Sequence, residues 1–173
     1  KEKDQGLLQP LPVPSGPFDT ITLDLVSLPP TQDGYDAAVV FVDKFSKYAI
    51  IEPCSKEVTA PGLGDIFINS VYTHFGLPRT IISDRDPRFT ANYWQAMFDH
   101  VSVKLKLSTP YHPQTDGQTE VANRTLISVL RAHALTRPEV WNRTIKIAQT
   151  EMNAATNKST KQSPFEVLYA FKP

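Results

Sequence analysis

Cysteine pairs, long apolar stretches and an excess of one charge are all missing from this sequence of 173 residues. Its single cysteine, Cys54, excludes a disulfide framework and a thiolate metal cluster within the chain, and the four histidines have no cysteine partners at zinc-finger spacing. No window of about 18 apolar residues occurs, so we expect no membrane span. No apolar run follows the opening KEKDQ, so we expect no secretion signal. These absences are typical of an intracellular protein that stays reduced.

The charges balance over the whole chain, with 18 Lys and Arg against 18 Asp and Glu. This balance argues against a basic module that coats nucleic acid through charge alone. The distribution is uneven, because residues 58–173 hold 13 basic and 9 acidic side chains, against 5 and 9 in residues 1–57. Apolar residues make up 40% of the chain, which is enough for one domain with its own core. Because the sequence starts with Lys rather than Met, we expect it to come from a longer protein.

The apolar pattern predicts an α/β domain over residues 18–173, after an extended proline-rich lead-in at residues 1–17. Alternating or wholly apolar stretches predict five strands, at residues 18–26, 36–43, 48–53, 79–83 and 101–108. Helical spacing and stop signals predict helices at residues 59–75, from after Asp84 to about Asp99, and at 118–135, 139–157 and 163–169. This order, β-β-β-α-β-α-β-α-α, predicts a mixed five-stranded sheet with helices on its faces.

Two aspartates stand in or just after predicted strands. Asp24 shares one face of the first strand with Thr22 and Val26, and a carboxylate in mid-strand is costly unless it is paired or bound to a metal. The alternative for Asp24 is an edge strand with one solvent-facing side. Asp84 directly follows the strand TIIS, where α/β sheets commonly place ligand-binding carboxylates, although a turn or helix cap would also explain it. Asp86 precedes a proline, as a helix N-cap does, so we assign Asp86 to structure and Asp84 to chemistry.

Glu120 lies in the first turn of the helix predicted at residues 118–135, where acidic residues also complement the helix dipole. At about 100° per residue, one side of this helix is predicted to face the core: Ala122, Thr125, Leu126, Val129, Leu130 and His133. The opposite side is predicted to carry Glu120, Asn123, Arg124, Ile127 and Arg131. A carboxylate, an amide, two guanidinium groups and an exposed isoleucine together indicate a surface that meets an anionic partner.

Asp24, Asp84 and Glu120 together form a ligand set for a hard divalent cation such as Mg²⁺, which prefers oxygen ligands and keeps waters or substrate phosphates in its shell. Three converging carboxylates without a metal would repel one another, and the pKa of at least one would rise. Two cations about 4 Å apart would remove that repulsion and flank a phosphodiester for in-line displacement. The sequence therefore predicts a two-metal phosphoryl-transfer site.

Several motifs in a fixed order resemble the catalytic core of retroviral and long-terminal-repeat retrotransposon integrases, closest to the gypsy type. They are GLLQPLPVP, FDTITLDLVSLPP, VVFVDKFSKYA, HFGLPRTIISDRDPRFT, TPYHPQTDGQTEVANRT and SPFEVLYAFKP, and they extend over essentially all 173 residues. The 35 residues between Asp84 and Glu120 are the spacing that names the family's aspartate–aspartate–glutamate triad.

The resemblance implies an RNase H-like fold and a polynucleotidyl transferase that uses two Mg²⁺ or Mn²⁺ ions. Asp24 and Asp84 would share one ion, and Asp24 and Glu120 the other. Water would first cleave the 3′ ends of the element's DNA, and the freed 3′-hydroxyls would then attack phosphodiesters of target DNA. The resemblance also implies a homodimer of cores, a higher oligomer formed with flanking domains, and a place in the nucleus and in virus-like particles.

Contacts with DNA are implied in the same way. The residues that would contact the element's terminal DNA are Tyr111, Gln114, Asn123 and Arg124. Arg88 would touch target DNA, and Arg131 joins the set because it shares the predicted side of Glu120. The sequence departs from the gypsy pattern at Val121, which replaces an arginine, and at Ile127, where related proteins more often have a polar side chain.

Two other functions stay open from the sequence. A ribonuclease H shares the fold and the metals and needs a catalytic acid on its first helix, where Asp65 stands, but helical spacing predicts that Asp65 faces solvent. A domesticated core, kept as a non-catalytic DNA-binding or dimerisation module, would be favoured by loss of a triad carboxylate, and none is lost.

Overall fold

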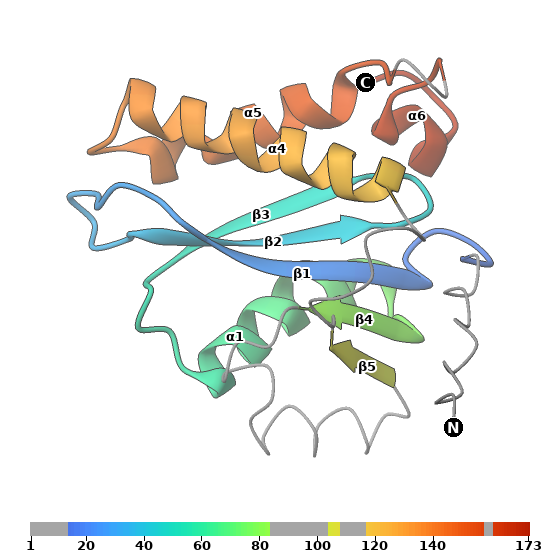
Figure 1. The fold of residues 1–173 in the computed structure, drawn as a ribbon, viewed down its shortest axis with the longest axis horizontal. Coiled ribbons are helices and arrows are strands. Elements are labelled where there is room, and N and C mark those ends of the chain that lie inside the picture. The colour runs from blue at the N-terminus through green and yellow to red at the C-terminus, as the bar shows by residue number, and fades with distance from the viewer. Residues whose placement is uncertain (1–13, 84–103, 108–116, 158–160) are drawn as a thin grey trace, which may run out of the picture.

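The computed structural model describes residues 14–83, 104–107, 117–157 and 161–173, with the backbone alone at 104–107 and 117–122. A five-stranded sheet forms the middle layer (Figure 1). The strands are β1 (Thr20–Ser27), β2 (Ala37–Asp43), β3 (Ala49–Cys54), β4 (Thr80–Ser83) and β5 (Lys104–Leu107). The helices are α1 (Ala60–Phe67), the π-helical turn η1 (Ile68–Tyr72), α2 (Thr73–Phe75), α4 (Gly117–Thr136), α5 (Trp141–Ala154) and α6 (Pro164–Tyr169).

The strand order across the sheet is β3-β2-β1-β4-β5. The first three strands form antiparallel pairs, whereas β4 runs parallel to β1 and β5 runs parallel to β4. The predicted mixed five-stranded sheet is therefore confirmed. Every residue of β2 is buried, as its run of apolar residues predicts for a strand covered on both faces.

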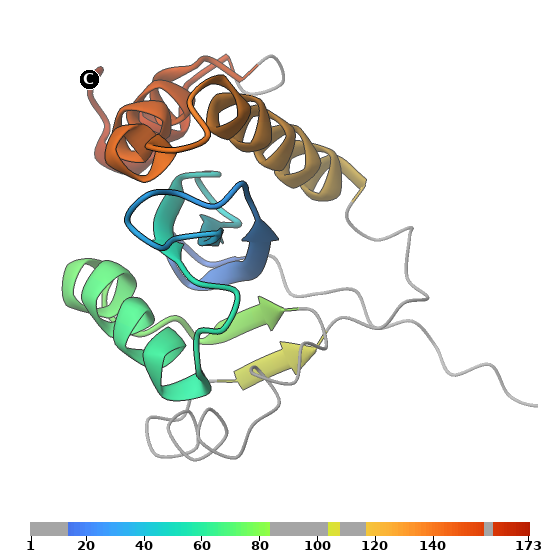
Figure 2. The ribbon, with the colours of Figure 1, turned by 90° about the vertical axis from the view of Figure 1, so that its left-hand side faces the viewer.

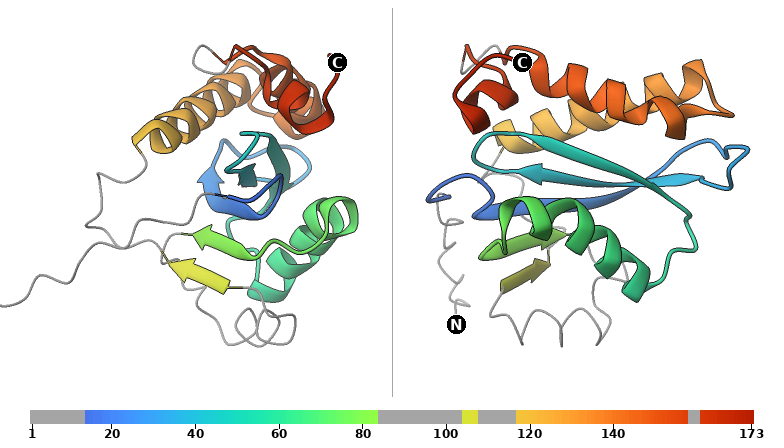
Figure 3. Two further views of the ribbon diagram at one scale, coloured as in Figure 1. Left: turned by 90° about the vertical axis from the view of Figure 1, so that its right-hand side faces the viewer. Right: turned by 180° about the vertical axis from the view of Figure 1, so that it is seen from behind.

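The α1–η1–α2 segment covers one face of the sheet, and α4 with α5 covers the other (Figures 2 and 3). The apolar cluster on the α1 side includes Ile21, Leu23, Phe41, Leu63, Phe67 and Val71. The cluster beneath α4 and α5 includes Val26, Val40, Val42, Leu130, Trp141 and Ile145. Because side chains alternate along a strand, β1 contributes to both clusters and fixes the two helical layers on opposite faces.

The single helix predicted at residues 59–75 is interrupted by the π-helical turn η1. Its start is capped by Thr59, whose hydroxyl accepts a hydrogen bond from the backbone N–H of Gly62 at 3.2 Å. It ends at Gly76, whose φ of +79° is rare for residues with a side chain. The helix predicted between Asp84 and Asp99 lies outside the described residues. No described helix is long and apolar enough to cross a membrane.

The outer edge of β3 is closed by side chains of α5. The amide of Asn153 accepts from the N–H of Ala49 and donates to its carbonyl oxygen, both at 2.8 Å. Two residues further on, the N–H of Ile51 donates to Gln149 Oε1 at 2.8 Å, and its carbonyl accepts from Lys146 Nζ at 2.8 Å. The helix thus supplies the bonds that another strand would supply, which protects this edge from pairing with another chain.

The loop between β1 and β2 is tied to the start of α5 by Asp33. Its carboxylate accepts two bonds from the guanidinium of Arg143, at 3.0 and 2.9 Å, and one from the amide of Asn142 at 2.8 Å. The hydrogen bonds from Arg143 and then from Asn142 lower the pKa of Asp33 to about 2. Beside this contact, the buried indole of Trp141 donates to the carbonyl of Pro29 at 2.7 Å.

Candidate active site

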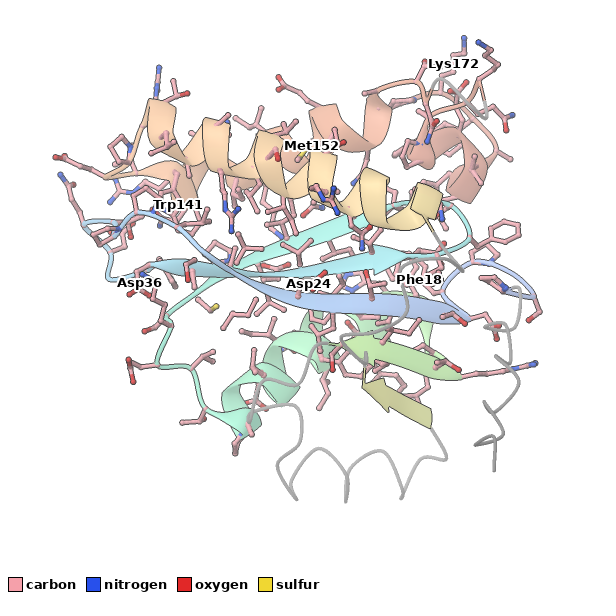
Figure 4. The ribbon with its side chains drawn as sticks, in the orientation of Figure 1. Phe18, Asp24, Asp36, Trp141, Met152 and Lys172 are labelled. Carbon is pink, nitrogen blue, oxygen red and sulfur yellow. The ribbon has the colours of Figure 1, made fainter. Side chains whose placement is uncertain are left out.

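Asp24 lies in the middle of β1, on the sheet face that α4 and α5 cover (Figure 4). Its neighbours on that face are Thr22 and Val26, and Val26 belongs to the apolar cluster beneath the two helices. Because β1 has β2 on one side and β4 on the other, the alternative that placed Asp24 on an edge strand is wrong. The carboxylate is half-buried, and a charge in such a place needs a cation or hydrogen-bond donors to compensate for its lost hydration.

The end of β4 brings the chain to Asp84. Ser83, the last residue of β4, pairs with Leu23 of β1 in parallel register. Asp84, the next residue, lies outside the described residues. Since adjacent strands lie about 4.8 Å apart, the described end of β4 lies beside the middle of the strand that carries Asp24.

Helix α4 brings Glu120 to the same face of the sheet. The Nδ2 of Asn123 donates to the Oγ1 of Thr22 at 3.1 Å, which fastens the start of α4 to β1 two residues from Asp24. Glu120 lies one turn before Asn123, and residues three apart share a side of a helix. Its side chain lies outside the described part of α4. The fold thus gathers on one face the carboxylate of Asp24, the backbone of Glu120 and the strand end that leads to Asp84.

The side of α4 that faces the sheet agrees with the predicted one only in part, because Leu126 and Leu130 pack toward the sheet as predicted. The residues that contact the sheet or pack into the cluster beneath it are Asn123, Leu126, Ile127, Leu130 and Ala134. Thr125 is exposed and Val129 is 46% exposed, so their predicted places in the core are wrong, as is the predicted exposure of Ile127. The physical reason is the surface that α4 meets, because β1 presents the hydroxyl of Thr22 where the helix begins, and an amide is the better partner there.

The remaining predicted residues fall into two groups. Arg124 and Arg131 are exposed on α4, as the helical spacing predicted, and their contact with DNA stays a prediction. Arg88, Tyr111 and Gln114 lie outside the described residues. Asp65 is exposed on α1, on the opposite side of the sheet from Asp24, so its predicted solvent-facing position is confirmed. This position removes the acid that the ribonuclease H alternative needed.

No pattern in the sequence predicted the hydrogen bond between Thr22 and Asn123. The available signal was a threonine on the same strand face as Asp24, two residues away. What the sequence could not supply was the partner, because the helix that carries Asn123 is about 100 residues further along the chain.

The donor set here suits a hydrated divalent cation. Asp24 offers carboxylate oxygens, and the Oδ1 of Asn123 is buried and accepts no hydrogen bond from the part of the chain that the structure describes. Buried amide oxygens are nearly always bonded, so this atom fits a donor such as a metal-bound water molecule. Among the described side chains, no three His, Cys, Asp or Glu residues gather as a metal site. The predicted ligand set also includes Asp84 and Glu120, whose side chains fall outside that group.

Comparisons with known proteins bear on the family and the fold of this chain. Residues 14–113 match the family described as the integrase core domain. The chain is 38% identical over 171 residues to the transposon Tf2-3 and Tf2-4 polyproteins of Schizosaccharomyces pombe, a match that covers 99% of this chain. The chain spans only 13% of the length of these relatives.

Solved structures show the same fold at low sequence identity. The HTLV-2 integrase catalytic core domain in complex with magnesium is 18% identical with a TM-score of 0.67, over 90% of this chain and 99% of that one. The BIV integrase core is 19% identical with a TM-score of 0.67, over 88% and 94%. A simian T-cell lymphotropic virus intasome, in complex with a PP2A regulatory subunit, is 18% identical with a TM-score of 0.72, over 89% and 55%. The predicted RNase H-like fold is confirmed.

Proposed function

This chain belongs to the integrase core domain family, and from that premise we propose that it is a metal-dependent polynucleotidyl transferase. In this proposal it cleaves the 3′ ends of a retroelement's DNA and joins them to target DNA. The observation that carries the proposal is the half-buried carboxylate of Asp24 in the middle of a central strand. Two further elements reach the same face, since β4 leads to Asp84 and α4 carries Glu120.

Asp24, Asp84 and Glu120 would hold the divalent cations, two Mg²⁺ or Mn²⁺ ions per site. Such ions polarise the phosphodiester and stabilise the attacking and leaving oxygens. The chain holds the carboxylate of Asp24 in a fixed position, because β1 is paired with β2 on one side and with β4 on the other. Half-burial of Asp24 also strengthens its attraction for a cation, since the surrounding dielectric is lower than that of water.

Both reactions then occur at one site. In the first, a water oxygen attacks a phosphodiester near the 3′ end, and the 3′-hydroxyl of the retained strand leaves. In the second, that 3′-hydroxyl attacks a phosphodiester of target DNA, so one phosphodiester replaces another and no ATP is needed. Neither step needs a covalent intermediate on the protein.

The DNA itself would be held outside the metal site. Exposed Arg124 and Arg131 on α4 can contact phosphates of the element's DNA, and Tyr111 and Gln114 would assist from the loop before α4. Arg88 would touch target DNA. The HTLV-2 core is known in dimeric and trimeric forms, which supports the proposal of a homodimer within a larger complex. Action on integrating DNA would place the protein in the nucleus and in virus-like particles.

The test is a joining assay with labelled DNA that ends in the element's terminal sequence, an unlabelled target DNA, and Mg²⁺ as the varied component. The proposal expects 3′-end cleavage products and longer joined products, both dependent on Mg²⁺. An RNA–DNA hybrid serves as the control substrate and should stay intact. Cleavage of the hybrid without joining would support a ribonuclease H instead.

A further inference from the structure

In the interface between α4 and the sheet, the side-chain amide of Asn123 has a described hydrogen-bond partner at its nitrogen but not at its oxygen. Asn123 is half-buried, and its Nδ2 donates to Thr22, while its Oδ1 is buried and has no hydrogen-bond donor among the described residues. The residues that follow on the same side of α4 are apolar and pack into the cluster beneath, namely Leu126, Ile127, Leu130 and Ala134. A buried oxygen without a donor is unfavourable, so this atom, on the face of β1 that also carries Asp24, fits a donor that comes from outside the described residues.

The Thr22–Asn123 bond links the two elements that carry predicted metal ligands. Thr22 precedes Asp24 by two residues on the same strand face, a separation of about 6.6 Å along the strand. Asn123 follows Glu120 by three residues, about 4.5 Å along the helix axis. Both connections run through regular secondary structure, so the bond sets how the backbone of Glu120 is placed relative to Asp24.

We propose that Thr22 and Asn123 are a positioning pair for the metal site, an inference that rests on the proposed function. Their hydrogen bond holds the start of α4 against β1, and the Oδ1 of Asn123 accepts a hydrogen bond from a water molecule of the bound cation. This differs from the DNA contact implied for Asn123 by family resemblance. Phosphate oxygens are acceptors only, so the Oδ1 cannot bind them, and a contact with DNA phosphate would have to use the second N–H of Nδ2.

The test uses Thr22→Val, which keeps the shape of the side chain and removes its hydroxyl. Its affinity for Mn²⁺ without DNA, followed by electron paramagnetic resonance, should fall about tenfold, as loss of an outer-shell partner does. The Mg²⁺ concentration for half-maximal joining should rise by a similar factor, while the rate at saturating Mg²⁺ stays within about twofold. Thr22→Ser should restore both values. Thr20→Val is the matched control and should change neither value, because Thr20 is a threonine on the same face of β1 and is buried.

A second pair of variants tests the same inference in case Thr22→Val does not fold. Asn123→Ala should show the same loss of Mn²⁺ affinity. Its matched control is Asn142→Ala, because Asn142 also donates from Nδ2, to Asp33, and also has a buried Oδ1 without a partner, but lies at the start of α5. Asn142→Ala should keep the parent's Mn²⁺ affinity.

The inference is overturned if Thr22→Val and Asn123→Ala bind Mn²⁺ as the parent does. It is also overturned if they weaken DNA binding in a metal-free buffer and leave the metal dependence unchanged, because the pair would then serve the DNA. A parent protein that binds Mn²⁺ but joins no DNA contradicts the proposed function alone. Reduced Mn²⁺ affinity of Thr22→Val would still support the pair in that case.

Discussion

Asn153 and Asn123 each join a helix to the strand beneath it, and the two contacts are completed differently. Asn153 is 2% exposed, and its amide uses both ends on Ala49 at the closed edge of β3. Asn123 uses one end on Thr22 and keeps a buried oxygen unbonded. The first contact is what a purely structural amide does, since nearly all buried polar groups are bonded. The second lies on the face of β1 that also carries Asp24, and its Oδ1 has no donor among the described residues.

An open oxygen alone does not mark a functional position, as Asn142 shows. Its Oδ1 is equally buried and unbonded, yet its amide serves the structural contact with Asp33. What distinguishes Asn123 is its place between the strand of Asp24 and the helix turn of Glu120. A missing bond therefore indicates a function only together with its location relative to the carboxylates.

The largest expected effect lies at the carboxylates. Asp24→Asn and Glu120→Gln should keep the fold and abolish cleavage and joining, because each keeps its shape and loses the charge of a metal ligand. The loss should exceed the roughly 10–100-fold that an outer-shell change costs. The joining assay with Mg²⁺ measures it, and circular dichroism verifies the fold. Asp65→Asn is the control and should stay within a few-fold of the parent, since its side chain is exposed on the other side of the sheet. Normal turnover by Glu120→Gln would remove Glu120 from the site.

Truncation of Asn153 should mainly reduce stability, whereas truncation of Asn123 should mainly reduce joining activity. Asn153→Ala leaves the N–H and carbonyl of Ala49 without partners at the edge of β3, so the free energy of unfolding should fall by about 2–4 kcal/mol. Asn123→Ala removes an unbonded buried oxygen together with one hydrogen bond, so the loss should stay below about 1 kcal/mol. Urea denaturation gives both values, and the joining assay on the folded proteins should rank them in reverse. Equal losses of stability in the two variants would show that the amides of Asn153 and Asn123 contribute to folding in the same way.

Local sequence patterns predicted the strands and helices better than the side-chain contacts between them. The buried run of β2 and the exposure of Asp65 follow from composition and periodicity over a few residues, and both are confirmed. The prediction for the sheet-facing side of α4 was right for Leu126 and Leu130 and wrong for Thr125 and Val129, because a helical wheel ranks residues by hydrophobicity. The strand beneath offers a hydroxyl, so Asn123 is turned inward while Val129 is 46% exposed. The closure of β3 by α5 joins residues about 100 positions apart, which no local pattern could reveal.

A smaller effect should appear at the structural end of the molecule as the pH is lowered. The pKa of Asp33 is about 2 in the folded protein, against an ordinary value of 3.8. A lowered pKa means that the charged form is favoured by folding, so this contribution to stability is complete above pH 3.8 and is lost as the pH falls toward 2. Asp33→Asn should therefore melt below the parent at pH 7, and the gap should close by about pH 2. A gap in melting temperature that is independent of pH would show that the charge of Asp33 is not what holds Arg143. Joining activity at pH 7 should be unchanged in the folded variant.

The smallest effects are expected on the outer side of α4, where Arg124 and Arg131 are exposed. Phosphate contacts set the affinity and salt dependence of DNA binding rather than its sequence choice. Each of Arg124→Ala and Arg131→Ala should weaken binding at low salt and lower the slope of log affinity against log salt by roughly one. Arg124 is one turn from Glu120, so its variant should also lose joining activity, whereas Arg131→Ala should lose mainly affinity. The alternative is that both are solvated arginines with little energetic role. If both variants bind DNA with the parent's slope, this side of α4 is not the DNA surface, and the contact must come from the loop before α4 or from other parts of the protein.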